Sequence, residues 1–395
     1  MEIEPRVQFD DTSVAFSYKS DRQLKKANFI FTLVNNPVIS PVATSLAKVA
    51  LKLRVPFAKT IVRNTIFEHF CGGETIQESE KTIATLKKFN VGTILDYSVE
   101  GEKTEHGFDE TTKEILRTIE KAKGNDAVPF CVFKVTGMAD TPLLEKKHSG
   151  ETLTPEETAA FERVRDRVDQ VCRKAFEYKL RILVDAEETW IQDPIDELAY
   201  EMMKKYNRQA AVVFNTFQMY RKDMSAKLRE AHQDSVKDNY ILGVKLVRGA
   251  YMEKEAERAE KRGYENPIHR TKEDTDKAFN KALTFCLDNK TRIALMCGSH
   301  NDYSNKFLTV LMEKHGVKPN DPRVWFGQLL GMSDHISFNL SKAGYNVAKY
   351  VPYGPVSAVM PYLIRRAQEN TSVSGQSSRE LQLIRKELKR RNKGN

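Results

Sequence analysis

Eight short apolar segments constrain the fold of this chain more than any other feature of its sequence. They span residues 92–97, 130–135, 181–187, 210–216, 241–250, 292–300, 323–330 and 345–352. Each is nearly continuous in apolar residues, which is typical of strands buried on both faces of a parallel sheet. The charged stretches between them have helical spacing. We therefore predict a (β/α)8 TIM-type barrel.

The length of 395 residues suits a barrel with added segments. We expect an N-terminal helical segment over 1–73, a catalytic barrel over 74–378 and a basic C-terminal tail over 379–395. A helix after the eighth strand should lie over the barrel mouth. A doubly wound open sheet is the alternative, but it would not need eight strands. No G-x-G-x-x-G follows any apolar segment either.

Cysteine and histidine usage narrows the chemistry. The five cysteines are an odd number and form no C-x-x-C pair, so we expect a reducing compartment and no disulfide framework. The eight histidines include no H-E-x-x-H, and no metal site is predicted.

The net charge of +9 is concentrated in two segments. Residues 42–70 carry five Lys or Arg against Glu68 alone, and the chain from Arg379 carries seven against Glu380 and Glu387. Two interpretations stay open: a solvated face, or contact with an anionic membrane surface. No nucleic-acid-binding motif accompanies the charge. The sequence predicts no transmembrane span, signal peptide or transit peptide.

Polar residues follow all eight apolar segments. Catalytic groups of such barrels lie at the carboxyl ends of the strands, so this repetition predicts an active site. The residues in question are Asp96, Glu100, Lys134, Asp185, Glu187, Asn215, Gln218, Lys245, Arg248, Tyr251, Ser299, His300, Asn301, Gln328, Tyr350 and Tyr353.

Four of the candidate residues have more than one interpretation. The adjacent Arg365 and Arg366 could grip a carboxylate in bidentate fashion, or form an exposed ion-pair set with Glu369. Lys134 could form a Schiff base, clamp a carboxylate or lie on the surface. His300 could act as a general base, contact a cofactor or belong to the core.

Several motifs together resemble the proline dehydrogenase family. They are FKVTG, VDAEE, KLVRGAYM, GSHN, FGQLLGM, KYVPYGP and YLIRRAQEN, and they occur in order between Asp96 and Asn370. The residues of KLVRGAY and FGQLLGM are more similar to the monofunctional, eukaryote-like branch than to the large bifunctional bacterial proteins. The resemblance implies FAD-dependent oxidation of L-proline to Δ1-pyrroline-5-carboxylate, with electrons passed to a membrane quinone. It also implies peripheral contact with the cytoplasmic face of a bacterial inner membrane, or with the matrix side of the mitochondrial inner membrane.

The resemblance assigns a role to each matching position. Lys134, Arg365 and Arg366 match a clamp on the proline carboxylate, which Glu369 would orient. Tyr251, Leu329 and Tyr350 match residues around the pyrrolidine ring, Asp185 and Glu187 match supporting acids, and Glu100 matches a gate glutamate. The flavin-contacting positions, which Glu187 joins, are Asn215, Lys245, Val247, Gly249, Ser299, His300, Asn301 and Gln328.

Three positions depart from the pattern of many bacterial members. Lys245 replaces Arg, Asn215 replaces the longer Gln, and Met252 replaces Trp. At Gln328 two alignments one residue apart are available. A hydroxyproline dehydrogenase of the same family and a Schiff-base aldolase using Lys134 are the enzymatic alternatives. A basic binding module without activity is the third.

Overall fold

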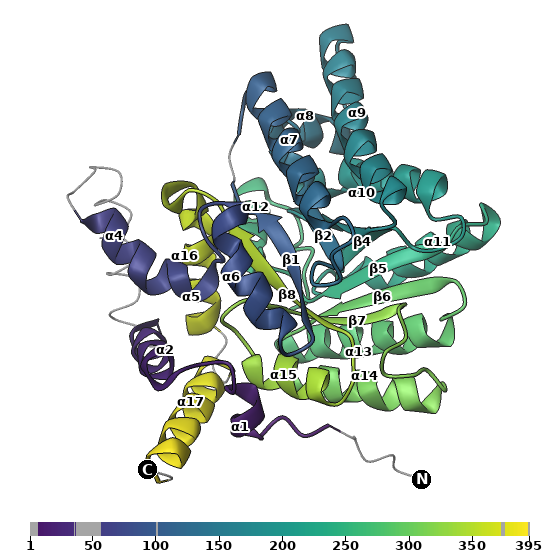
Figure 1. Cartoon of the computed structure of the whole chain (residues 1–395). Helices are drawn as coiled ribbons and strands as arrows, with labels where there is room; N and C mark the ends of the chain where they lie inside the picture. The colour runs from purple at the N-terminus through teal and green to yellow at the C-terminus, as the bar shows by residue number, and fades with distance from the viewer. Residues whose placement is uncertain (1–6, 35, 37–56, 100–101, 373–375, 394–395) are drawn as a thin grey trace. The chain divides into compact units, whose positions relative to one another are not determined.

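A computed structural model describes residues 7–34, 36, 57–99, 102–372 and 376–393 (Figure 1). Eight parallel strands follow one another in chain order around a closed barrel, which confirms the predicted fold class. Every predicted apolar segment overlaps one strand. The strands are β1 (Val91–Tyr97), β2 (Phe130–Lys134), β3 (Arg181–Asp185), β4 (Val213–Gln218), β5 (Leu242–Val247), β6 (Ile293–Gly298), β7 (Val324–Leu329) and β8 (Val347–Tyr353).

Helices alternate with the strands, as the charged segments predicted. They are α7 (Glu105–Ala122), α8 (Thr141–His148), α9 (Pro155–Glu177), α10 (Thr189–Tyr206), α11 (Met224–Lys237), α12 (Met252–Arg262), α13 (Lys272–Asp288), α14 (Asp302–Lys314) and α15 (Asp334–Lys342), with the short 3-10 helix η2 (Val135–Gly137) after β2. Helix α9 begins with a capping box, in which the Thr154 hydroxyl accepts the backbone N–H of Glu157 and the Glu157 carboxylate accepts that of Thr154.

Further helices precede β1 and follow β8. The N-terminal ones are α1 (Thr12–Ala15), α2 (Asp21–Val34), α4 (Ala58–Val62), the π-helix η1 (Arg63–Phe67), α5 (Glu68–Phe70) and α6 (Ile76–Lys87). The C-terminal ones are α16 (Val356–Ser372) and α17 (Gln376–Lys393). Most of the basic apolar segment between residues 42 and 62 lies outside the described residues.

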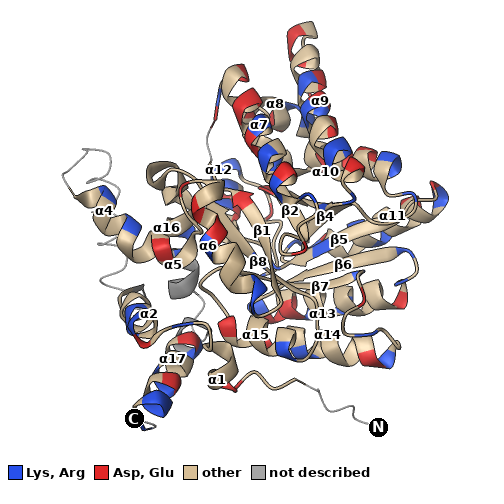
Figure 2. Cartoon of the chain, viewed as in Figure 1, with Lys and Arg blue, Asp and Glu red and all other residues tan. Residues whose placement is uncertain are grey.

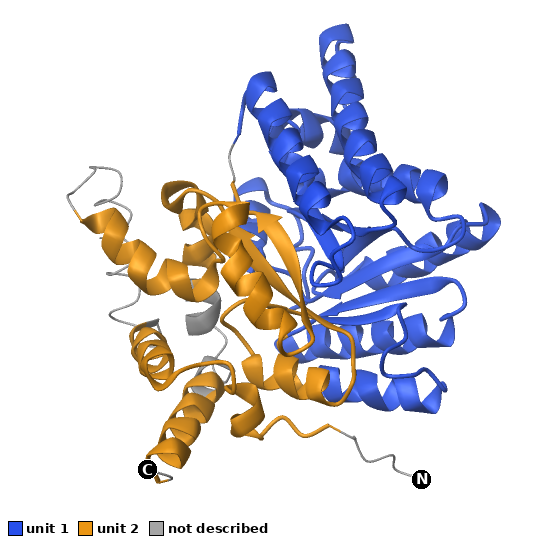
Figure 3. Cartoon of the chain, viewed as in Figure 1, with its two compact units in different colours: residues 1–4, 101–299, 303–326 blue, residues 5–100, 300–302, 327–395 orange. Residues whose placement is uncertain are grey.

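The chain divides into two compact units (Figure 3). Unit 1 comprises residues 1–4, 101–299 and 303–326, and in it β2 to β6 pair in succession. Unit 2 comprises residues 5–100, 300–302 and 327–395. In unit 2, β1 pairs with β8, with Ile94 opposite Tyr350.

The helices at the two ends of the chain share a hydrophobic core within unit 2. Phe16, Leu24 and Phe31 from the N-terminal side pack in one cluster with Leu363 of α16 and Ile384 of α17. Residues 379–393, expected as part of a basic tail, therefore belong to a packed helix. Its charged residues lie among others spread over the helices in Figure 2.

Two further expectations concern cysteines and membranes. All five cysteines are buried free thiols, in agreement with the prediction of no disulfide framework. Within the described parts of the chain, no helix is both long and apolar enough to cross a bilayer.

Candidate active site

Two lysines and one aspartate form a cluster toward the carboxyl ends of β2, β3 and β5, all in unit 1, in which Asp185 and Lys245 are buried and Lys134 is half-buried. The Lys134 Nζ lies 2.8 Å from Asp185 Oδ2, and the Lys245 Nζ lies 2.5 Å from Asp185 Oδ1. Burial alone would raise the pKa of Asp185, but the two ammonium groups outweigh it and hold that pKa well below its usual range. The cluster thus places two ammonium groups on one carboxylate.

A second carboxyl group lies two residues beyond Asp185. Glu187 is 4% exposed, and its carboxylate accepts the Thr136 backbone N–H at 3.0 Å and the Thr136 hydroxyl. Burial raises the pKa of Glu187 to about 7, although the Thr136 bonds and the Lys134 charge oppose the rise. This group changes charge near neutral pH, whereas Asp185 stays ionised.

The two faces of β4 have different surroundings. Asn215 donates from Nδ2 to Asp196 of α10 at 2.8 Å, and its Oδ1 accepts the Thr216 backbone N–H. Asn215 thus lies on the helix-facing side of the sheet. Thr216 is opposite Lys245 in the parallel register and shares its face. Gln218, two residues on, lies on this inner face, and its Nε2 donates to the Glu187 backbone oxygen at 2.7 Å.

This register offers Gln218 as a second candidate for the flavin contact on β4. The Asn215 amide is 1% exposed and is bound on the helix side, so it is not directed into the barrel. Gln218 provides an inward-facing amide at the end of the same strand. Strand alternation could have selected Gln218 from the sequence, once the inward direction of Lys245 was known.

The ends of β5 and β6 are linked by an arginine. Arg248 donates to Ser299 Oγ and Ser304 Oγ, each at 2.9 Å, and to Asp276 at 2.6 Å. Next to it, Gly249 has a φ of 134°, and a Cβ there would lie 2.5 Å from the Tyr220 ring. The Tyr220 ring therefore packs directly against the Gly249 backbone, and only glycine fits at this position. Arg248 was among the polar residues predicted at the strand ends. The resemblance gave it no role of its own and assigned flavin contacts only to its neighbours Val247 and Gly249.

Unit 2 contains the predicted residues of β7 and β8. Tyr350 is 7% exposed, and its backbone oxygen accepts the Leu330 N–H at 2.8 Å. Gln328 accepts from the hydroxyl of Ser337, which belongs to α15, at 2.9 Å, so its amide faces that helix. Leu329 lies on the opposite face of β7. Of the two possible alignments at Gln328, the one shifted by one residue to Leu329 places the matched position on the inner face of the barrel.

The predicted carboxylate clamp of unit 2 lies on α16. Arg366 is 7% exposed and lies 5.2 Å from the centre of the Tyr362 ring, while Arg365 is half-buried. The side chain of Glu369 and the whole of Glu100 lie outside the described residues. Tyr251 precedes α12 in unit 1 and is half-buried.

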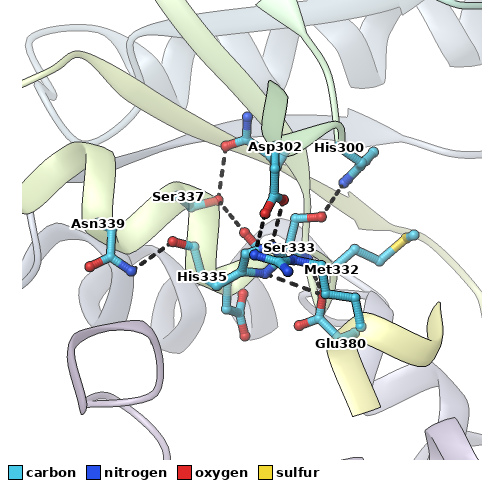
Figure 4. A network of polar contacts seen from close by, with 12 residues as sticks. His300, Asp302, Met332, Ser333, His335, Ser337, Asn339 and Glu380 are labelled. Atoms are coloured by element: carbon cyan, nitrogen blue, oxygen red, sulfur yellow. Dashed lines mark hydrogen bonds and ion pairs between the residues drawn. The ribbon is translucent and has the colours of Figure 1, made fainter. Parts of the chain in front are cut away.

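His300 and Asn301 follow β6 and belong to unit 2. The His300 Nδ1 lies 2.9 Å from the Ser333 hydroxyl (Figure 4). Asp302, the first residue of α14, lies 2.9 Å from the His335 imidazole. His300 is thus tied to the turn that follows β7. This assigns it to a polar network and not to the apolar core.

The described residues of unit 1 suit a phosphate-bearing heteroaromatic cofactor. Cationic and N–H donors lie at the ends of β4, β5 and β6: Gln218, Lys245, Arg248 and Ser299. Such donors match phosphate oxygens and ring carbonyls.

Comparison with known proteins identifies the family. The proline dehydrogenase profile matches residues 79–379. The chain belongs to the proline dehydrogenase family. It is therefore an enzyme of an FAD-dependent oxidoreductase family.

Curated relatives support the same assignment. CarD, a carbapenem antibiotics biosynthesis protein of Pectobacterium carotovorum subsp. carotovorum, is 35% identical over 82% of this chain and 83% of its own length. The mitochondrial proline dehydrogenase 1 of Dictyostelium discoideum is 35% identical over 84% and 65%, respectively. Mitochondrial proline dehydrogenase 2 of Arabidopsis thaliana is 33% identical over 84% and 79%. The predicted eukaryote-like branch is confirmed.

Solved structures support the fold. Proline utilization A from Bdellovibrio bacteriovorus, inactivated by N-propargylglycine, superposes with a TM-score of 0.72 at 20% identity. The match covers 92% of this chain and 38% of that one. The protein of the same name from Corynebacterium freiburgense gives a TM-score of 0.67 at 17% identity, over 95% and 36%. This chain thus spans less than half of these larger proteins.

Proposed function

We propose that this protein oxidises L-proline to Δ1-pyrroline-5-carboxylate with FAD as cofactor and passes the electrons to a membrane quinone. The observation that carries the proposal is the cluster at the strand ends in which the Lys134 and Lys245 ammonium groups both contact the buried Asp185 carboxylate. In a protein of the proline dehydrogenase family, such a cluster at the strand ends suits an amino-acid carboxylate and a flavin that becomes more negative on reduction.

The substrate carboxylate would be held by cations. We assign this task to Lys134, Arg365 and Arg366, with Glu369 orienting the two arginines and Glu100 acting at the gate. Guanidinium groups bind a carboxylate through paired N–H bonds, while Lys134 adds a compact charge. The Asp185 carboxylate accepts a hydrogen bond from the Lys134 ammonium group at 2.8 Å and directs it.

The pyrrolidine ring would be packed by Tyr251, Leu329 and Tyr350. Fixing the ring against the acceptor atom is the main catalytic task, and positioning of this kind supplies about 7–11 kcal/mol of a barrier. A phenol at Tyr350 leaves little space for a ring hydroxyl. We therefore expect a higher kcat/KM for proline than for hydroxyproline, and equal values would favour the hydroxyproline alternative.

Bound FAD supplies the acceptor for a hydride equivalent from proline C5. We assign its binding to the side chains of Gln218, Lys245, Ser299, His300 and Asn301 and to the backbone at Val247 and Gly249. Lys245 and Arg248 offer positive charge to a cofactor that carries phosphates. Glu187, with a pKa of about 7, holds a proton on its carboxyl group in part of the population at neutral pH, which limits the negative charge near the site.

The quinone acceptor implies contact with a membrane surface. We propose that exposed cations of α17 take part, because Arg385, Lys389 and Lys393 recur every four residues along one face of the helix. The contact would be peripheral.

An absorption spectrum is the experiment that tests the proposal. Purified protein should be yellow, and L-proline should bleach the flavin band without oxygen while Δ1-pyrroline-5-carboxylate forms. A colourless protein that is trapped by borohydride with a carbonyl substrate would instead support the aldolase alternative at Lys134. Flavin absorbance that proline leaves unchanged would contradict the proposed substrate.

A further inference from the structure

The turn between β7 and α15 has an unusual backbone. Gly331 has a φ of 76° and Ser333 a φ of 52°, both in the left-handed region. A Cβ on Gly331 would lie 2.5 Å from the His69 carbonyl oxygen. Serine rarely adopts this conformation, and such residues persist where their surroundings fix them; they are concentrated at functional sites.

Two buried charged side chains hold this turn through its backbone. The Glu380 carboxylate, on the C-terminal helix α17, accepts the Ser333 N–H at 2.7 Å. The Lys349 Nζ of β8 donates to the Met332 carbonyl oxygen at 2.8 Å. Glu380 is 5% exposed and Lys349 is fully buried. The turn is therefore fixed by contacts from β8 and from α17, 47 residues further along the chain.

Within this turn, the Ser333 side chain contacts His300, the predicted cofactor contact. The Ser333 hydroxyl lies 2.9 Å from the His300 Nδ1 (Figure 4). The partner of one imidazole nitrogen sets the tautomer and the orientation of the ring. Glu380 is thus linked to His300 through one residue.

Helix α17 holds the His300 loop by a second route. Asp302, two residues after His300, lies 2.5 Å from the Arg379 guanidinium and 2.9 Å from His335 Nε2. The His335 Nδ1 in turn lies 3.8 Å from the Glu380 carboxylate. Both the turn that contacts His300 and the residue that continues its loop are therefore attached to the start of α17.

We propose that Glu380 is a positioning residue that orients His300 toward FAD by fixing the Ser333 turn. This inference rests on the proposed function of His300 as a cofactor contact. Glu380 itself does not touch the cofactor in this assignment. The consequence is that α17, outside the eight β/α repeats of the barrel, determines how well the cofactor binds.

Substitutions on one helix can separate positioning from stability. Glu380→Ala removes the acceptor for the Ser333 N–H, whereas Glu380→Gln keeps an oxygen acceptor of the same length. Glu387→Ala is the matched control. Glu387 is likewise a buried glutamate of α17, but its partners are Thr12, Arg390 and Arg391. Ser333→Ala removes only the hydroxyl that contacts His300.

Reconstitution of the apoprotein with FAD gives the decisive measurement. We expect Glu380→Ala and Ser333→Ala each to weaken FAD binding by about tenfold. Their double variant should be no weaker than either one, because both act through one contact. Glu387→Ala should lower Tm as much as Glu380→Ala but leave the FAD Kd within about twofold of the parent value. Glu380→Gln should restore the parent FAD Kd.

Imidazole nitrogen NMR of the apoprotein provides a readout without flavin. The His300 signals should shift in Glu380→Ala and Ser333→Ala and stay in place in Glu387→Ala. Equal FAD affinities of the Glu380→Ala and Glu387→Ala variants would overturn the positioning role, and so would an unaltered Kd in Ser333→Ala. Because Ser333→Ala leaves Glu380 intact, it decides the matter if Glu380→Ala does not fold. Unchanged FAD binding in His300→Gln would instead remove the cofactor contact from the proposed function.

Discussion

Substitution of Arg366 gives the most direct test of the proposed carboxylate clamp. Arg366 is 7% exposed, and its guanidinium lies near the Tyr362 ring. Loss of one partner from a buried charge pair costs about 2–5 kcal/mol of binding. We therefore expect Arg366→Ala to raise the KM for proline by about 30-fold or more. Steady-state kinetics measures this, with flavin content as the control for folding. A KM equal to that of the parent would exclude Arg366 from the carboxylate clamp.

Glu187 should make stability depend on pH. Its folded-state pKa of about 7 exceeds the ordinary glutamate value of 4.5. Between these values the folded state keeps a proton that the unfolded state loses, so this residue's contribution to stability falls as pH rises, by at most about 1.4 kcal/mol per pH unit. Glu187→Gln should therefore gain stability relative to the parent from pH 5 to 7.

Urea unfolding at several pH values tests this expectation. The difference in unfolding free energy between Glu187→Gln and the parent should increase across the window and level off above pH 7. Glu157→Gln is a suitable control, because the pKa of Glu157 is lowered, by its bond to Lys146 first. A difference that does not vary with pH would show that Glu187 titrates normally.

At the scale of elements, β4 presents one amide to each of its faces. Asn215 bonds Asp196 of α10, and Gln218 bonds the backbone of Glu187. We expect Gln218→Ala to weaken FAD binding at nearly unchanged Tm. Asn215→Ala should lower Tm by several degrees, because Asp196 loses a buried partner. Apoprotein melting and FAD titration of both variants distinguish these effects. The reverse result would show that Asn215 is the flavin contact.

The same strand shows how far the sequence can predict the site. The eight apolar runs of the sequence were sufficient to predict the eight strands, because continuous hydrophobicity indicates burial on both faces. Continuous hydrophobicity also removes the alternation that would tell the inner face from the outer one. Asn215 and Gln218 therefore looked equivalent until the contacts of Lys245 and Asp196 oriented the sheet.

Helix α17 shows a second limit of sequence reasoning. Its cations outnumber its acids, which predicted a basic tail. The two acids, Glu380 and Glu387, are seven residues apart and share a face with Leu383 and Ile384, all four of which are buried. Spacing of this kind indicates a helix packed on one side. What that side packs against depends on α1, α2 and the Ser333 turn, which are distant in sequence.

At the scale of the whole molecule, the packing of α17 changes how membrane contact should be tested. Deleting residues 379–395 would remove the buried Glu380, Leu383 and Ile384 along with the charges. Loss of vesicle binding by such a truncation would not separate unfolding from lost electrostatics. Substitution of exposed cations leaves the buried face of the helix intact.

We therefore expect the triple variant Arg385→Gln, Lys389→Gln and Lys393→Gln to bind anionic vesicles less tightly than the parent. Each surface cation contributes about 1 kcal/mol near an anionic membrane, so the loss is up to about 3 kcal/mol, or roughly 150-fold in partitioning. The matched control replaces Lys237, Lys314 and Lys318, which are exposed in unit 1, and changes the net charge equally. Co-sedimentation with phosphatidylserine vesicles at low and high salt measures both variants. Equal losses in the two would indicate that net charge alone governs binding, and undiminished binding in the α17 variant would exclude this helix from the membrane contact.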